Sequence, residues 1–126
     1  MTKSYSKDIQ LLMKILKNQQ NIKEVMAQFN CNASNIEQNK FAFDLCAFYM
    51  AQIGEASKLL TDDTKKALEH FDADTTKYFR NMVDHVYEKV NKTVLKAYIF
   101  DMISNDTVKE IKARIKYCNE HAKDNK

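Results

Sequence analysis

The sequence predicts an all-α fold, a single domain over residues 1–126 built as a bundle of five or six helices with short loops. Apolar residues recur at three- and four-residue steps along most of the chain, which is the period of an amphipathic helix. Proline is absent and Gly54 is the one glycine. The residues on which tight hairpins and phosphate-binding loops depend are therefore nearly missing. Hydrophobic residues at 44% and charged residues at 29% are typical of a globular domain.

The first helix is expected over about residues 5–29, where the apolar positions keep the helical period. Residues 30–34, Asn-Cys-Asn-Ala-Ser, interrupt this pattern with side chains that favour turns and caps. Ser34 or Asn35 is expected to cap a second helix, which covers about residues 36–60.

The second helix is apolar on more than one side. One stripe consists of Phe41, Leu45, Phe48 and Leu59. Further apolar residues widen it well past a single face: Cys46, Tyr49, Met50, Ile53 and Leu60. A helix with two apolar sides needs two partners. The rest of the bundle is one, and we expect a second copy of the chain to be the other, in a two-fold dimer.

The remaining chain predicts short helices separated by capping residues. Thr61 opens a third helix that extends through Phe71, and Asp74 or Thr75 caps a fourth that ends near Val90. Helical periodicity then continues from Val94 to Met102, and Ser104 or Asn105 caps the last helix. A polar tail from about residue 122 is expected to fray.

Charge and cysteine content narrow the class of protein. The chain has 20 basic and 17 acidic residues, and residues 64–126 hold 13 of the former and 10 of the latter. This mild excess permits contact with a phosphate backbone without requiring it. No signal peptide or membrane span is recognisable, and three cysteines without a C-x-x-C pair indicate a reducing compartment. We therefore expect a cytoplasmic protein without membrane association.

No metal or other cofactor is expected. Cys118 and His121 are spaced like half of a zinc site, but the sequence holds no second half. His70 and His121 lie in polar surroundings near helix ends, and we interpret both as ordinary surface residues.

The segment from Phe79 to Tyr87 is the most promising candidate site. It places Arg80, Asn81, Asp84, His85 and Tyr87 on one amphipathic helix, and Arg80 is one of only two arginines among the 20 basic residues. On a helical wheel Arg80 and Tyr87 share one shoulder of the buried stripe, at about 100° and about 80°, while His85 lies near the other at about 240°.

Two interpretations of this segment remain open from periodicity alone. In the first, Arg80 and Asp84 pair across one helical turn, His85 is solvated and Tyr87 packs at the rim of the bundle. In the second, Arg80 and His85 converge because the helix bends or because a two-fold axis brings a second copy of the segment opposite the first.

The order and spacing of these residues favour the second interpretation. The pattern R-N-x-x-x-H-x-Y, from Arg80 to Tyr87, resembles the HEPN (higher eukaryotes and prokaryotes nucleotide-binding) domains, specifically their HepT-like branch. Upstream, residues 50–60 contain Gln52-Ile-Gly-Glu55 and resemble the second core helix of that branch. Residues 8–12, Asp-Ile-Gln-Leu-Leu, are similar to its opening helix, so the resemblance covers most of the chain in order.

The resemblance implies an all-α homodimer that acts as the toxin of a toxin–antitoxin pair. Arg80 and His85 would face a cleft between subunits and form a metal-independent endoribonuclease, with Asn81 as a supporting polar group. The family's partner is a minimal nucleotidyltransferase antitoxin, which in similar systems transfers AMP onto the motif tyrosine, here Tyr87.

The chemistry of the residue types agrees with ribonuclease activity. RNA carries its own nucleophile, so a base near neutrality and a fixed cation can drive internal transesterification, leaving a 2′,3′-cyclic phosphate. Histidine suits proton transfer and arginine suits the phosphoryl oxygens. Asp84 departs from the family, whose members usually have a small aliphatic residue at this position, and its carboxylate would weaken cleavage. The alternative is a non-catalytic helical partner that docks the nucleotidyltransferase and presents Tyr87 for AMPylation.

Overall fold

The computed structural model describes residues 2–71 and 92–124. In this part of the chain the secondary structure is entirely helical, which confirms the predicted all-α class. The elements are, in chain order, α1 (Thr2–Gln28), the 3-10 helix η1 (Ile36–Gln38), α2 (Lys40–Lys58), α3 (Asp62–Ala67), α5 (Lys92–Met102) and α6 (Asn105–Asp124).

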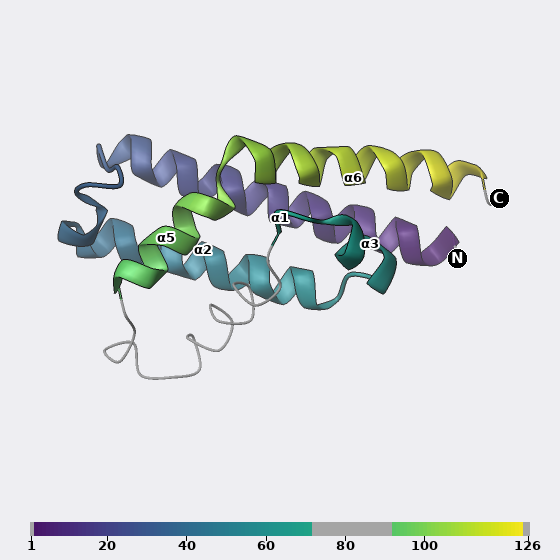
Figure 1. Ribbon diagram of the computed structural model, residues 1–126, viewed down its shortest axis with the longest axis horizontal. Helices are drawn as coiled ribbons and strands as arrows, with labels where there is room; N and C mark the ends of the chain where they lie inside the picture. Colours follow the sequence, from purple (N-terminus) through teal and green to yellow (C-terminus); the bar gives the residue numbers. More distant parts are fainter. Residues whose placement is uncertain (1, 72–91, 125–126) are drawn as a thin grey trace.

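The long helices α1, α2 and α6 form the body of the fold. Figure 1 shows α1 and α6 side by side and antiparallel, with α2 packed against α1 below them. The shorter α5 contacts α2, η1 and α6 at one end, and α3 lies at the other end, where α1 starts and α6 ends. No helix within the described ranges is long and apolar enough to cross a bilayer.

One continuous core joins α1, α2, α5 and α6. Its fully buried large apolar side chains are Leu12, Ile15 and Ile22 from α1, Ile36 from η1, Phe43, Met50 and Ile53 from α2, Leu95 and Ile99 from α5, and Ile111 from α6. Each such aliphatic or aromatic side chain stabilises the fold by roughly 1.5–3 kcal/mol relative to an exposed one. Because these positions recur at helical spacing, the sequence pattern accounts for which faces pack together.

The end of α1 follows from Asn30, as the break in periodicity predicts. Asn30 has a φ of 56°, the left-handed conformation that asparagine tolerates better than most residues. The Cys31 amide then donates to the Met26 carbonyl at 2.7 Å. This bond satisfies a free carbonyl of the last turn in the manner of a Schellman motif.

The predicted single helix over residues 36–60 is wrong at its start. The chain forms the short η1 first, and α2 begins only at Lys40. Asn39 is the N-cap, because its side-chain oxygen accepts from the Ala42 amide at 3.1 Å. Asn35, one of the two expected caps, makes no side-chain cap bond to η1, and its oxygen instead accepts from the Asn32 amide at 2.8 Å.

The third helix is shorter than predicted. Thr61 caps α3 as expected, but the helix ends at Ala67 and does not continue to Phe71. Glu110 of α6 provides the physical reason, because its carboxylate accepts from the His70 amide at 2.8 Å and from the Phe71 amide at 3.1 Å. These backbone donors are satisfied by α6, so the chain leaves the helix and buries Phe71.

The C-terminal elements agree closely with the periodicity. α5 is helical from Lys92, the first described residue after residue 71, and contains the expected stretch from Val94 to Met102. Ser104, one of the two predicted caps, caps α6 because its hydroxyl oxygen accepts from the Thr107 amide at 3.3 Å. α6 extends to Asp124, into the polar tail that is expected to begin at about residue 122.

Candidate functional site

The five residues of the predicted site, Arg80, Asn81, Asp84, His85 and Tyr87, lie between residues 72 and 91, outside the described residues. The helices outside this segment contain two features of possible functional interest. The first is the outward face of α2, which carries exposed apolar side chains. The second is a buried polar cluster that joins α1, α3 and α6.

The Gln52–Glu55 segment lies in the last third of α2. Ile53 and Gly54 are buried, whereas Glu55 is exposed. Ala47, Ala51 and Gly54 follow at steps of four and three, so these small residues share one buried face of α2. Small side chains allow close helix packing, and α2 makes extensive contacts with α1.

The opposite face of α2 carries large apolar side chains in solvent. Phe41 is 64% exposed, Phe48 is 54% exposed and Leu59, the C-cap residue of α2, is 55% exposed. Leu45 and Tyr49 beside them are half-buried. The sequence prediction of a helix apolar on two sides is confirmed, because the inner face packs into the core and the outer face lacks cover in the described structure. We call these five residues the α2 outer stripe.

The polar cluster is centred on Asp8, which is fully buried. Its carboxylate accepts from the Thr61 amide at 3.0 Å and from the hydroxyls of Thr61 and Thr64 at 2.6 Å each. Thr64 in turn accepts from Nε of Arg114 at 3.0 Å. A chain of hydrogen bonds thus runs from the guanidinium of α6 through a threonine of α3 to the carboxylate of α1.

Aromatic rings surround Arg114 on its other side. Its guanidinium carbon lies 4.3 Å from the centroid of the Tyr117 ring and 5.7 Å from that of Tyr5. His121 stacks on Tyr117 with a centroid distance of 3.8 Å. Rings within about 6 Å of a guanidinium stabilise it by cation–π interaction. Arg114 is therefore held in place by both Thr64 and the rings, in the manner of a structural residue.

The thiols near these features are poor nucleophiles. Burial raises the pKa of Cys46 from 9.0 to about 12, and burial also raises the pKa of Cys118, which lies 4.0 Å from the Thr64 hydroxyl. The reactive and metal-binding form of cysteine is the thiolate. Both side chains consequently act as small apolar residues of the core at neutral pH.

Sequence reasoning missed the Asp8 cluster. Asp8 contributes to the family resemblance only as part of an opening-helix pattern, and Arg114 is the second of the two arginines in the chain. The one indication in the sequence was the arginine at position 114 where lysine is far commoner, since a guanidinium donates in a fixed direction and stacks on rings.

The prediction that His70 is a surface residue is confirmed by its exposure.

No family model, curated protein or solved structure matches this chain at a significant level.

Proposed function

We propose that this protein is a metal-independent endoribonuclease of the HepT-like HEPN type, acting as the toxin of a toxin–antitoxin pair. The observation that carries the proposal is the motif Arg80-Asn81-x-x-x-His85-x-Tyr87 in the same chain as Gln52-Ile-Gly-Glu55. Support comes from the all-helical architecture of the described residues, in which the second segment occupies a long core helix.

The reaction uses a nucleophile that RNA already contains. A base removes the proton of a ribose 2′-hydroxyl, and the 2′-oxygen attacks the adjacent phosphorus while the bond to the 5′-oxygen breaks. The products are a 2′,3′-cyclic phosphate and a 5′-hydroxyl, whose oxygen gains a proton. In this proposal His85 transfers a proton, and Arg80 stabilises the negative charge that develops on the phosphoryl oxygens. Asn81 supports the pair as a polar neighbour.

The α2 outer stripe supports a homodimer as the active form. Phe41, Phe48 and Leu59 are exposed on the same side of α2, and clustered exposed apolar side chains mark sites of protein association. A two-fold axis would bring two copies of the Arg80–Tyr87 segment into one assembly. The antitoxin is proposed to be a minimal nucleotidyltransferase that transfers AMP to Tyr87, which places a new anion near the RNA site.

Cleavage of RNA by the purified protein in excess chelator is the direct test. We expect wild-type protein to cut RNA and to leave 2′,3′-cyclic ends, and we expect both Arg80→Ala and His85→Ala to reduce the rate by about 100-fold or more. His70→Ala is the matched control, because His70 is exposed and only its backbone amide bonds to Glu110. Wild-type protein that leaves every RNA intact would contradict the enzymatic proposal.

Asp84 gives the alternative function a specific basis. A carboxylate beside His85 would repel RNA or pair with Arg80, and either effect weakens cleavage. If Asp84→Ala also leaves RNA intact, the chain is better described as a non-catalytic partner of the nucleotidyltransferase. Mass spectrometry after co-expression with that enzyme then tests the binding role, with AMP expected on the Tyr87 peptide.

A further inference from the structure

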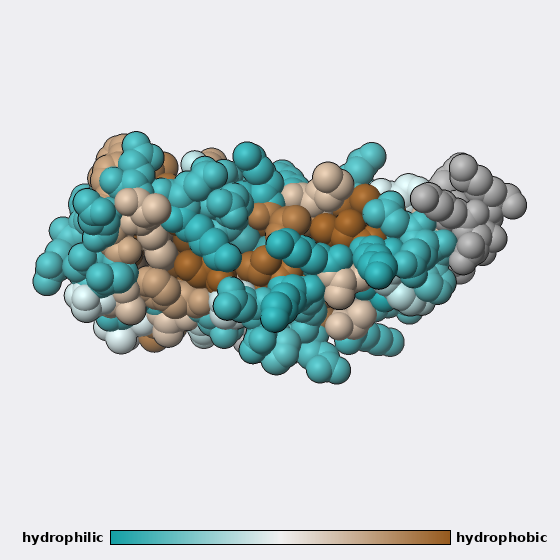
Figure 2. Space-filling model, turned by 90° about the horizontal axis from the view of Figure 1, so that it is seen from above, coloured by the Kyte–Doolittle hydropathy of each residue, from teal (hydrophilic) through white to brown (hydrophobic). Residues whose placement is uncertain are grey.

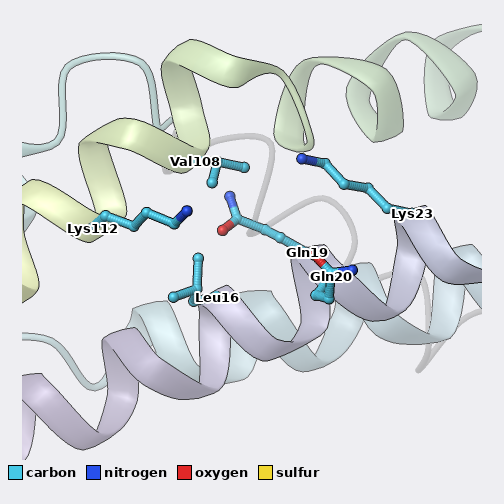
Figure 3. Close-up of a pocket in the computed structure, with 6 residues that line it drawn as sticks. All are labelled: Leu16, Gln19, Gln20, Lys23, Val108 and Lys112. Atoms are coloured by element: carbon cyan, nitrogen blue, oxygen red, sulfur yellow. The ribbon is translucent and has the colours of Figure 1, made fainter.

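A groove between α1 and α6 has the features of a small-molecule site. Its volume is about 310 Å³. It is lined by Leu16, Gln19, Gln20 and Lys23 of α1 and by Val108 and Lys112 of α6 (Figure 3). This volume lies at the lower end of the range for small-molecule pockets. All six residues belong to helices that do not include the Arg80–Tyr87 motif.

Gln19 lines this groove and carries an unused hydrogen-bond acceptor that neighbouring atoms cover. The residue is 1% exposed, and its Nε2 donates to the Met102 carbonyl at 2.9 Å. The opposite amide orientation would set oxygen against oxygen, so the Met102 carbonyl fixes which end is the donor. Oε1 has no hydrogen-bond partner in the described structure. A buried acceptor without a donor is unfavourable, so a ligand hydroxyl that displaced the atoms covering Oε1 would gain from binding here.

Two ammonium groups accompany this acceptor, one from each helix. Figure 3 shows Lys112 reaching from α6 toward the Gln19 amide and Lys23 reaching from α1 toward α6. Neither lysine has an ion-pair partner among residues 2–71 and 92–124, and no carboxylate lines the groove. Two uncompensated positive charges beside a concave surface favour an anion.

Of the three remaining lining residues two are apolar, and the third is the polar Gln20. Leu16 and Val108 face the groove from opposite helices. Seen from the side of α1 and α6, the surface shows a band of hydrophobic residues between hydrophilic margins (Figure 2). A ligand for this groove therefore combines an anionic group, a hydroxyl donor and a small carbon skeleton.

From these features we propose that the groove binds a small phosphomonoester that carries hydroxyl groups, of the size of a pentose phosphate. Its phosphate would contact Lys23 and Lys112, and one hydroxyl would donate to Oε1 of Gln19. A phosphomonoester carries close to two negative charges at neutral pH, which matches the two lysines. The proposal does not depend on ribonuclease activity, because it uses different residues and a different ligand.

Calorimetric titration with two matched probes tests this assignment. Ribose 5-phosphate has the phosphate and the hydroxyls, whereas n-butyl phosphate has the phosphate and an apolar chain without a hydroxyl. We expect ribose 5-phosphate to bind about tenfold more tightly, since only this probe satisfies Gln19. We expect Lys23→Gln and Lys112→Gln each to weaken binding by about tenfold. Lys14→Gln is the control, because Lys14 lies on the opposite face of α1 and is exposed.

Amide chemical shifts of α1 and α6 in an NMR titration locate the ligand on the chain. Shifts confined to residues around Gln19 and Lys112 support the proposal. Equal affinity for both probes, or affinity unchanged in both lysine variants, overturns it. A short oligoribonucleotide that shifts these amides when ribose 5-phosphate does not would also overturn it, in favour of an RNA-backbone contact. The comparison of the two probes on wild-type protein tests the role of Gln19 without a Gln19 variant. Such a variant would also lose the hydrogen bond to the Met102 carbonyl.

Discussion

At the scale of single residues, Asp8 shows how a fully buried carboxylate is accommodated in this fold. Burying an ionised group is unfavourable unless hydrogen bonds replace its hydration. The two threonines of the α3 start provide three such bonds, and Arg114 donates to one of those threonines. Because Asp8 of α1 accepts from Thr61 and Thr64 at α3, and Thr64 accepts from Arg114 of α6, the network joins three helices that are distant in the sequence.

Removal of the Asp8 carboxylate is therefore expected to destabilise the whole bundle. Asp8→Ala leaves the Thr61 amide and two hydroxyls without an acceptor, so we predict a loss of at least about 3 kcal/mol in the free energy of unfolding. Asp101 is an exposed aspartate of α5, so Asp101→Ala should change the free energy of unfolding by less than about 0.5 kcal/mol. Urea unfolding followed by circular dichroism measures both values.

A double-mutant cycle with Thr64→Val separates the network from simple burial. Since Asp8 and Thr64 share a hydrogen bond, the effects of the two substitutions should fail to add by about 0.5–3 kcal/mol. Additive effects would mean that Asp8 contributes through desolvation alone and that the chain from Arg114 to Asp8 has no energetic coupling.

At the scale of elements, helix boundaries depend on individual side-chain oxygens. Asn39 begins α2 because its oxygen accepts from the Ala42 amide. Asn39→Ala removes this bond, and we predict a loss of about 1 kcal/mol in the free energy of unfolding. Asn39→Asp retains an oxygen acceptor and should keep most of the stability. Equal unfolding midpoints for Asn39→Ala and wild type would show that the Asn39 cap contributes nothing.

The same boundaries show what the sequence could and could not predict. The long periodic stretches of α1, α5 and α6 were predictable because their apolar residues alone define a buried face. The start of α2 was not, since residues 30–39 contain several asparagines and serine that can all cap a helix. The end of α3 depends on Glu110, which is about 40 residues away in the chain. Such long-range bonds leave no local pattern, and the Asp8 cluster was missed for the same reason.

At the scale of the whole molecule, the described helices leave large apolar side chains of α2 exposed outside the core. The α2 outer stripe has Phe41, Phe48 and Leu59 more than half exposed. Water contact with this much apolar surface is unfavourable, and covering it with a second copy would remove it from solvent. The proposed dimer therefore has a physical driving force that does not depend on the catalytic proposal.

A charge placed on the α2 outer stripe should separate the proposed dimer. We predict that wild-type protein sediments with twice the chain mass of 14.7 kDa and that Phe48→Glu sediments as the single chain. Desolvating an unpaired carboxylate at the centre of an interface is strongly unfavourable, so the dissociation constant should rise at least about 100-fold. Analytical ultracentrifugation at micromolar concentration measures both species.

Met13→Glu is the matched control for this experiment. Met13 is 56% exposed on α1, so it receives the same charge on an apolar residue of similar exposure outside the stripe. If Met13→Glu separates the dimer and Phe48→Glu does not, the interface lies on α1 instead of α2. A monomeric wild type would contradict the dimer altogether.

RNA cleavage by the Phe48→Glu monomer then links assembly to function. Activity that falls with dissociation, while the fold measured by circular dichroism is retained, means that two copies together complete the catalytic site.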